Sequence, residues 1–140
     1  YGDGRQVRDW LFVEDHCEAL DLLLHEGRPG EVYNIAADNH RQNIQVAEAI
    51  LELLGKPRSL VRHVEDRPGH DRRYSLDWSK IRALGWAPRH GFDEALAKTV
   101  AWYADNEWWW QKVRSGAYED YYQRQYGWRL EMAARREGEG

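Results

Sequence analysis

The feature that most constrains the fold of this chain is a short apolar run at residues 31–37, which lies between two stretches with helical spacing. The run follows Pro29 and Gly30, and a short apolar run after such a turn is typical of a buried strand. In the stretch before it, Asp15 is placed to cap a helix. The apolar residues of that helix recur at Cys17, Leu20, Leu23 and Leu24.

The stretch after the apolar run predicts a second helix, which Asn43 can cap and which Gly55 and Pro57 end. Helix, strand and helix in this order favour an α/β layer architecture. Farther along, the pattern predicts two more strands and one long amphipathic helix, at residues 60–64, 74–78 and 92–113.

Length and composition narrow the class of protein. The 140 residues suit one domain with a hydrophobic core, and no stretch resembles an apolar membrane span. The net charge of −4 argues against a protein that mainly binds nucleic acid. Cys17 is the single cysteine, so a disulfide framework is excluded, and its place on the apolar helix face predicts burial. No targeting segment is visible, and a cytoplasmic protein is therefore expected.

A charged turn is the first candidate for chemistry. It holds three arginines and a histidine around a Pro68-Gly69 pair: Arg67, His70, Arg72 and Arg73. Because like charges repel, either an anion binds among these residues, or Asp66 and Asp71 neutralise them within the turn. The sequence leaves both alternatives open.

Arg8 is the second candidate, because it stands directly before an apolar run that ends at Val13. It either pairs with Asp9 or Glu14, or it faces a ligand. A planar guanidinium suits phosphate or carboxylate oxygens better than an ammonium does.

Several motifs of enzyme sites are missing from the sequence. There is no glycine-rich dinucleotide loop after a strand, no G-x-S-x-G, no H-E-x-x-H and no tyrosine followed four residues later by a lysine. The six histidines show no metal-ligand spacing, so no metal site is expected. The aromatic residues of the segment 102–110 are expected to be buried rather than to stack on a ligand.

Three strings of residues carry a resemblance to a known family. They are R-D-W-L-F-V-E-D-H from Arg8, Y-N-I from Tyr33 and D-R-P-G-H-D-R-R-Y from Asp66. Together they resemble the C-terminal half of the dTDP-glucose 4,6-dehydratases, which are enzymes of the extended short-chain dehydrogenase/reductase superfamily. The resemblance runs from Tyr1 to about Arg129 in the family's order.

The resemblance implies an α/β fold made of the end of a Rossmann-type layer and a small substrate-binding domain. Residues 1–37 would belong to the nucleotide-binding layer, residues 38–129 to the sugar-nucleotide domain, and residues 130–140 to a disordered tail. It also implies a binding site in which Arg8 and Arg67 hold the diphosphate. The same nucleotide pocket would include Asn43, Asp66, Pro68, Gly69 and His70.

The family reaction converts dTDP-glucose to dTDP-4-keto-6-deoxyglucose by NAD-mediated hydride transfer and elimination of water. The NAD loop and the Tyr-x-x-x-Lys pair of the family have no counterpart in these 140 residues, so no catalytic residue is assigned and the segment alone is expected to be inactive. The resemblance implies a dTDP-sugar as substrate and a homodimer for the complete enzyme. The alternative is a non-catalytic module that binds a nucleotide diphosphate or a protein.

Overall fold

The computed structural model describes residues 1–66, 68–114 and 116. The chain forms two compact units, residues 1–100 and residues 101–140. Arg67 and the tail expected at residues 130–140 lie outside the described residues. Among the described helices, none is long and apolar enough to cross a membrane.

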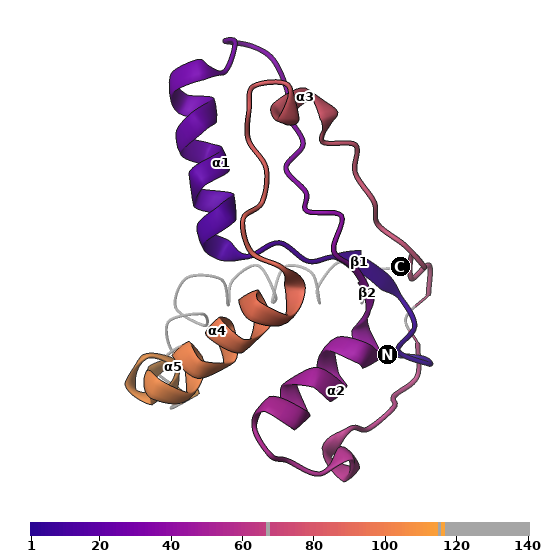
Figure 1. The fold of residues 1–140 in the computed structure, drawn as a ribbon. Coiled ribbons are helices and arrows are strands. Elements are labelled where there is room, and N and C mark those ends of the chain that lie inside the picture. The colour runs from indigo at the N-terminus through magenta and orange to yellow at the C-terminus, as the bar shows by residue number, and fades with distance from the viewer. Residues whose placement is uncertain (67, 115, 117–140) are drawn as a thin grey trace, which may run out of the picture. The chain divides into compact units, whose positions relative to one another are not determined.

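A small sheet lies at the start of the chain. Strand β1 (Val7–Asp9) pairs in antiparallel fashion with strand β2 (His40–Gln42), and Arg8 faces Arg41 in the register. The other edge of β1 meets the end of the charged turn, because the Val7 N–H donates to the Arg72 carbonyl oxygen at 2.8 Å. The Tyr74 N–H returns to the Val7 carbonyl oxygen at 3.2 Å. Two distant parts of the sequence are thereby held against β1 (Figure 1).

Helix α1 (Val13–Glu26) begins earlier than the sequence predicts, because Phe12 and not Asp15 occupies the N-cap. Asp15 lies within the first turn and is only 1% exposed. Its Oδ2 accepts the His90 backbone N–H at 3.1 Å, and its Oδ1 lies 2.8 Å from His90 Nδ1. Burial raises the pKa of Asp15, but the hydrogen bonds from His90 and from the Arg89 backbone outweigh it and hold the pKa below its ordinary value.

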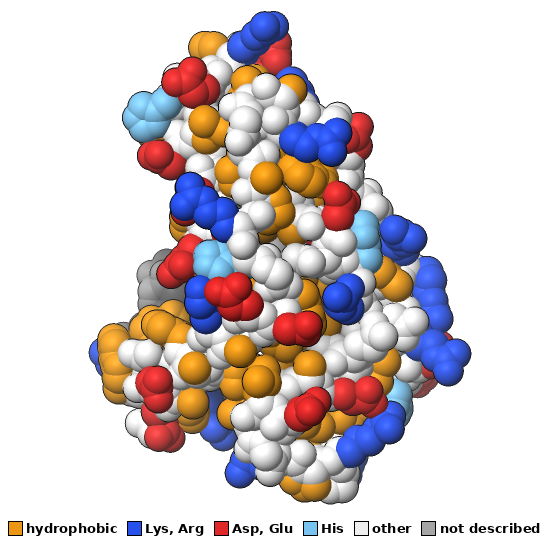
Figure 2. Space-filling model, in the orientation of Figure 1, with side chains coloured by type: hydrophobic (Ala, Val, Ile, Leu, Met, Phe, Trp, Pro, Cys, Tyr) orange, Lys and Arg blue, Asp and Glu red, His pale blue; other side chains and the backbone are white. Residues whose placement is uncertain are grey.

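The side of α1 that is buried also differs from the prediction. Ala19 is fully buried and forms the core with Ile81 and Trp86, while Leu22 and Leu23 pack against that core. Cys17 is exposed, so its predicted burial is wrong. The exposed large side chains of α1 are Val13, Leu20 and Leu24. Figure 2 shows hydrophobic side chains reaching the surface in several places.

Residues 31–37 do not form the predicted strand. A strand needs a neighbour for its backbone N–H and C=O groups, and no described segment pairs with this one. The segment instead packs Tyr33 and Ile35 against the core of Ala19, Ile81 and Trp86. The strands predicted at 60–64 and 74–78 are also absent; residues Arg58–Leu60 form a short 3-10 helix, η1.

Helix α2 (Asn43–Leu53) begins at Asn43, which is its first helical residue and not its cap. Gln42 is the N-cap and forms a capping box with Gln45: its backbone N–H donates to Gln45 Oε1 at 2.9 Å, and its side chain accepts the Gln45 backbone N–H. The short helix α3 (Ser79–Arg82) contributes Ile81 to the core. The helix predicted at 92–113 is two helices, α4 (Phe92–Asp105) and α5 (Glu107–Arg114), separated at Asn106.

At the break, the backbone N–H and the side-chain amide of Asn106 both donate to the Trp102 carbonyl oxygen, at 3.0 Å and 2.8 Å. The burial predicted for the nearby aromatic residues is wrong for Trp102, Trp108 and Trp109, which are exposed. Trp102 and Trp109 pack edge to face with their ring centres 5.4 Å apart.

Candidate anion-binding site

The guanidinium of Arg8 is held in place by neutral groups. Its Nη1 donates to the Val7 carbonyl oxygen at 2.7 Å, and its Nη2 donates to the Asp71 carbonyl oxygen at 3.2 Å. Nη2 also lies 3.3 Å from Nε2 of His70. The guanidinium carbon stands 4.2 Å from the centre of the Tyr74 ring. The cation is therefore fixed by β1, by the charged turn and by an aromatic face.

Arg8 has no carboxylate partner among the described residues. The pairing with Asp9 or Glu14, one of the two alternatives from the sequence, does not occur. Asp9 instead accepts the backbone N–H groups of residues 37–39 at 2.9 to 3.1 Å. Because Arg8 is half-buried and its described partners are all neutral, it is a candidate for binding an anion.

His70 and Asp66 form the neighbouring pair. His70 Nδ1 lies 2.6 Å from Oδ1 of Asp66, and the His70 side chain is only 7% exposed. The amide nitrogen of Gln6 donates to the second carboxylate oxygen of Asp66 at 3.0 Å. This network joins the residue before β1 to the charged turn.

Two contacts of the acids in the turn are described: Asp66 with His70 Nδ1 at 2.6 Å, and the carboxylate of Asp71, which accepts the hydroxyl of Tyr74 at 2.6 Å. Arg72 pairs outside the turn, with Asp3 at 2.9 Å. The backbone N–H of Arg5 and the Arg72 guanidinium hold the pKa of Asp3 below its ordinary value.

Asn43 lies beside this cluster, since its backbone N–H donates to the Gln6 carbonyl oxygen at 3.0 Å. The next helical N–H, of Ile44, donates to the Gly4 carbonyl oxygen at 2.8 Å. Together with the capping box, these bonds occupy the first backbone donors of α2. Pro68 and Gly69 are exposed.

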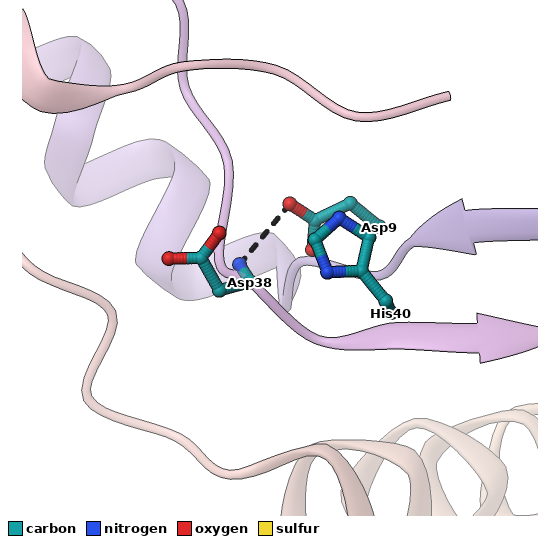
Figure 3. Close-up of side chains that lie close together, drawn as sticks. All are labelled: Asp9, Asp38 and His40. Carbon is teal, nitrogen blue, oxygen red and sulfur yellow. Dashed lines mark hydrogen bonds between the residues drawn. The ribbon is translucent and has the colours of Figure 1, made fainter. Parts of the chain in front are cut away.

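One group of potential metal ligands occurs among the described residues: Asp9, Asp38 and His40, whose donor atoms lie within 4.8 Å of one another (Figure 3). Both oxygens of Asp9 accept backbone N–H groups, and the Trp78 indole N–H donates to Asp38 Oδ2 at 2.9 Å. His40 Nε2 lies 3.0 Å from a serine hydroxyl. All three side chains make hydrogen bonds or close polar contacts within the chain, and we assign no metal to them.

Two members of the cluster were not found from the sequence. Gln6 is 2% exposed, but a lone glutamine before a short strand carries no signal that it is buried. Tyr74 was expected only as an alternating strand residue. Its place against Arg8 follows from the pairing of residues 72–74 with β1, which is a contact between distant segments.

A family model and the sequences of known proteins both identify this chain as similar to sugar-nucleotide dehydratases. The model of the family described as GDP-mannose 4,6 dehydratase matches residues 1–99. The dTDP-glucose 4,6-dehydratase of Xanthomonas campestris pv. campestris is 52% identical over 128 residues, which cover 84% of this chain and 36% of that protein.

Solved structures agree with this similarity. The dTDP-glucose 4,6-dehydratase of Bacillus anthracis in complex with NAD is 49% identical, with a TM-score of 0.73, over 79% of this chain and 35% of that chain. That of Streptomyces venezuelae, also with NAD bound, is 47% identical, with a TM-score of 0.74, over 79% of this chain and 34% of that chain. The chain thus spans about 36% of the length of the curated relatives it matches. The predicted fold class, part of an extended short-chain dehydrogenase/reductase, is confirmed.

Proposed function

Because the chain belongs to the GDP-mannose 4,6-dehydratase family, we propose that it forms the sugar-nucleotide-binding portion of a dTDP-glucose 4,6-dehydratase. The complete enzyme would convert dTDP-glucose to dTDP-4-keto-6-deoxyglucose. The relatives that carry this name support the choice of substrate, and the identity of about 50% extends over most of this chain.

The observation that carries the proposal is the uncompensated charge of Arg8. Its described partners are two backbone carbonyl groups, a histidine nitrogen and an aromatic face. A guanidinium has five N–H donors, and three of those of Arg8 are used in these contacts. The remaining donors suit the oxygens of a diphosphate, to which charged hydrogen bonds are short and strong.

The other residues of the proposed pocket are Asn43, Asp66, Arg67, Pro68, Gly69 and His70. Asn43 supports the proposal through its place beside the cluster, since its backbone N–H donates to the Gln6 carbonyl oxygen at 3.0 Å. The role of Arg67 rests on the D-R-P-G-H string alone, since the residue lies outside the described part. As a second guanidinium it would contact the same diphosphate.

NAD is the cofactor found with the neighbouring structures, and it would accept and return the hydride in the complete enzyme. This sequence has no glycine-rich loop to hold the NAD pyrophosphate, so we assign no NAD contact to the chain. In our proposal the chain binds and orients the nucleotide end of the substrate. We also propose a cytoplasmic homodimer that binds neither nucleic acid nor membrane, on the basis of the net charge of −4, the single cysteine and the family resemblance.

The test is calorimetric titration of dTDP into the complete enzyme. Replacing Arg8 by Ala should weaken binding by roughly 10- to 150-fold, because a charged hydrogen bond contributes about 1.5–3 kcal/mol. Arg62→Ala is the matched control, since Arg62 is exposed and lies outside the cluster. Equal affinities for the wild type and Arg8→Ala would refute the assignment of the diphosphate to Arg8.

A further inference from the structure

Gln6 is a buried polar residue that packing does not explain. The residue is 2% exposed, and its side-chain oxygen is buried with no hydrogen-bond partner among the described residues. A buried polar atom without a partner is unfavourable, so an apolar side chain of the same size would serve packing at least as well. The amide nitrogen has a partner, however, and that partner is the Asp66 carboxylate at 3.0 Å.

The direction of each hydrogen bond in the cluster follows from which of its two groups can donate a proton and which can only accept one. An ionised carboxylate only accepts, so the contact of 2.6 Å between Asp66 and His70 Nδ1 requires a proton on Nδ1. A guanidinium only donates, so the contact of 3.3 Å between Arg8 Nη2 and His70 Nε2 requires a lone pair on Nε2. Both neighbours therefore demand the same form of His70, the neutral ring with its proton on Nδ1.

The two carboxylate oxygens of Asp66 accept hydrogen bonds from different residues. Oδ2 accepts from Gln6 and Oδ1 accepts from His70, so the amide fixes the rotation of the carboxylate toward the ring. Among the described residues, the groups in contact with His70 are Asp66, Arg8 and the Tyr1 ring, whose centre lies 6.4 Å from that of the imidazole in a T-shaped arrangement. Of these, Asp66 and Arg8 carry charge, one on each ring nitrogen.

We propose that Gln6 is a positioning residue for Arg8. Acting through Asp66, its amide keeps His70 in the Nδ1–H form, and the Nε2 lone pair then holds the Arg8 guanidinium in the orientation that meets the substrate diphosphate. The inference rests on the proposed function for the role of Arg8 as diphosphate ligand. The series of contacts from Gln6 to Arg8 stands on the geometry alone.

The test replaces Gln6 by Met, which keeps the side-chain volume and removes the amide donor, in the complete enzyme. We expect dTDP affinity, measured by calorimetry, to fall about threefold to tenfold, less than for Arg8→Ala, because the lost bond acts on the diphosphate only through Arg8. Nitrogen-15 spectra of labelled histidines should show the Nδ1–H form of His70 in the wild type and a mixture of both neutral forms in Gln6→Met. Gln111→Met, an exposed glutamine on α5, is the matched control and should leave both readouts unchanged.

A double-mutant cycle separates positioning from general destabilisation. If Gln6 acts through Arg8, Gln6→Met should cost no further affinity once Arg8 is replaced by Ala. Additive losses, or an Nε2–H ring in the wild type, would overturn the proposal. If the wild type does not bind dTDP at all, the proposed function fails, whereas the histidine spectra still decide whether Gln6 sets the form of His70.

Discussion

Arg67 is the residue whose role depends most directly on the sequence, because it lies outside the described residues. If it contacts the diphosphate, Arg67→Ala in the complete enzyme should weaken dTDP binding by roughly 10- to 150-fold. Arg67→Lys should recover only part of this loss, since an ammonium cannot reproduce a two-pronged contact. Calorimetric titration at matched salt measures both effects.

Arg72 provides the control for this prediction within the same turn. Its guanidinium is engaged by Asp3 at 2.9 Å and its side chain is 59% exposed, so Arg72→Ala should have the milder effect on dTDP affinity. The opposite ranking, with binding lost in Arg72→Ala and kept in Arg67→Ala, would contradict the assignment of roles within the turn.

The sequence singled out residues that lie together in the structure, but it did not predict the contacts that join them. Arg8, Asp66 and His70 were found from their strings, and the structure brings these three together. The place of Gln6 depends on burial, and that of Tyr74 on a backbone pairing with β1. Neither property is encoded by the identity of a residue or of its sequence neighbours.

At the scale of elements, helices were predicted more closely than strands. The apolar spacing located α1 and α2, and only their first residues differ, because Phe12 and Gln42 occupy the N-caps. A helix satisfies its own backbone, whereas a strand requires a partner segment. Residues 31–37 carry a strand pattern but have no pairing partner among the described residues, so the pattern alone could not yield a strand.

The contact between Asp15 and His90 makes the attachment of α1 depend on pH. The pKa of Asp15 is lower in the folded chain than its ordinary value of 3.8, so folding favours the ionised carboxylate. This contribution to stability is fully present above the unfolded pKa and is lost as the pH falls through the lowered folded pKa. Urea unfolding between pH 2 and 7 should therefore show a loss of stability at the acid end.

Asp15→Asn keeps the shape of the side chain and removes this titration. We expect it to lower the free energy of unfolding at pH 7 by about 1–3 kcal/mol, because a buried charged hydrogen bond is weakened. Its stability should also depend less steeply on pH at the acid end than that of the wild type. If the free energy of unfolding of Asp15→Asn falls at low pH as steeply as that of the wild type, another carboxyl group is responsible.

At the scale of the whole molecule, α1 presents a second apolar face. Leu24 is 81% exposed and Leu20 is 51% exposed, and both lie away from the buried Ala19. Val32, in the unpaired segment that follows, is 80% exposed. Apolar surface that is gathered on one element drives association, because burying it releases water.

We therefore expect the 140-residue chain to self-associate and to bind a hydrophobic fluorescent dye. Replacing Leu20 and Leu24 together by Glu should reduce both properties without loss of helix content, since neither side chain contributes to the core of Ala19, Ile81 and Trp86. Leu53→Glu on α2, where the leucine is 47% exposed, is the control and should change association less. Sedimentation velocity at several concentrations, with dye fluorescence and circular dichroism on the same samples, measures these effects. A wild-type chain that sediments as a single monomer and binds no dye would show that the exposed face of α1 does not drive association.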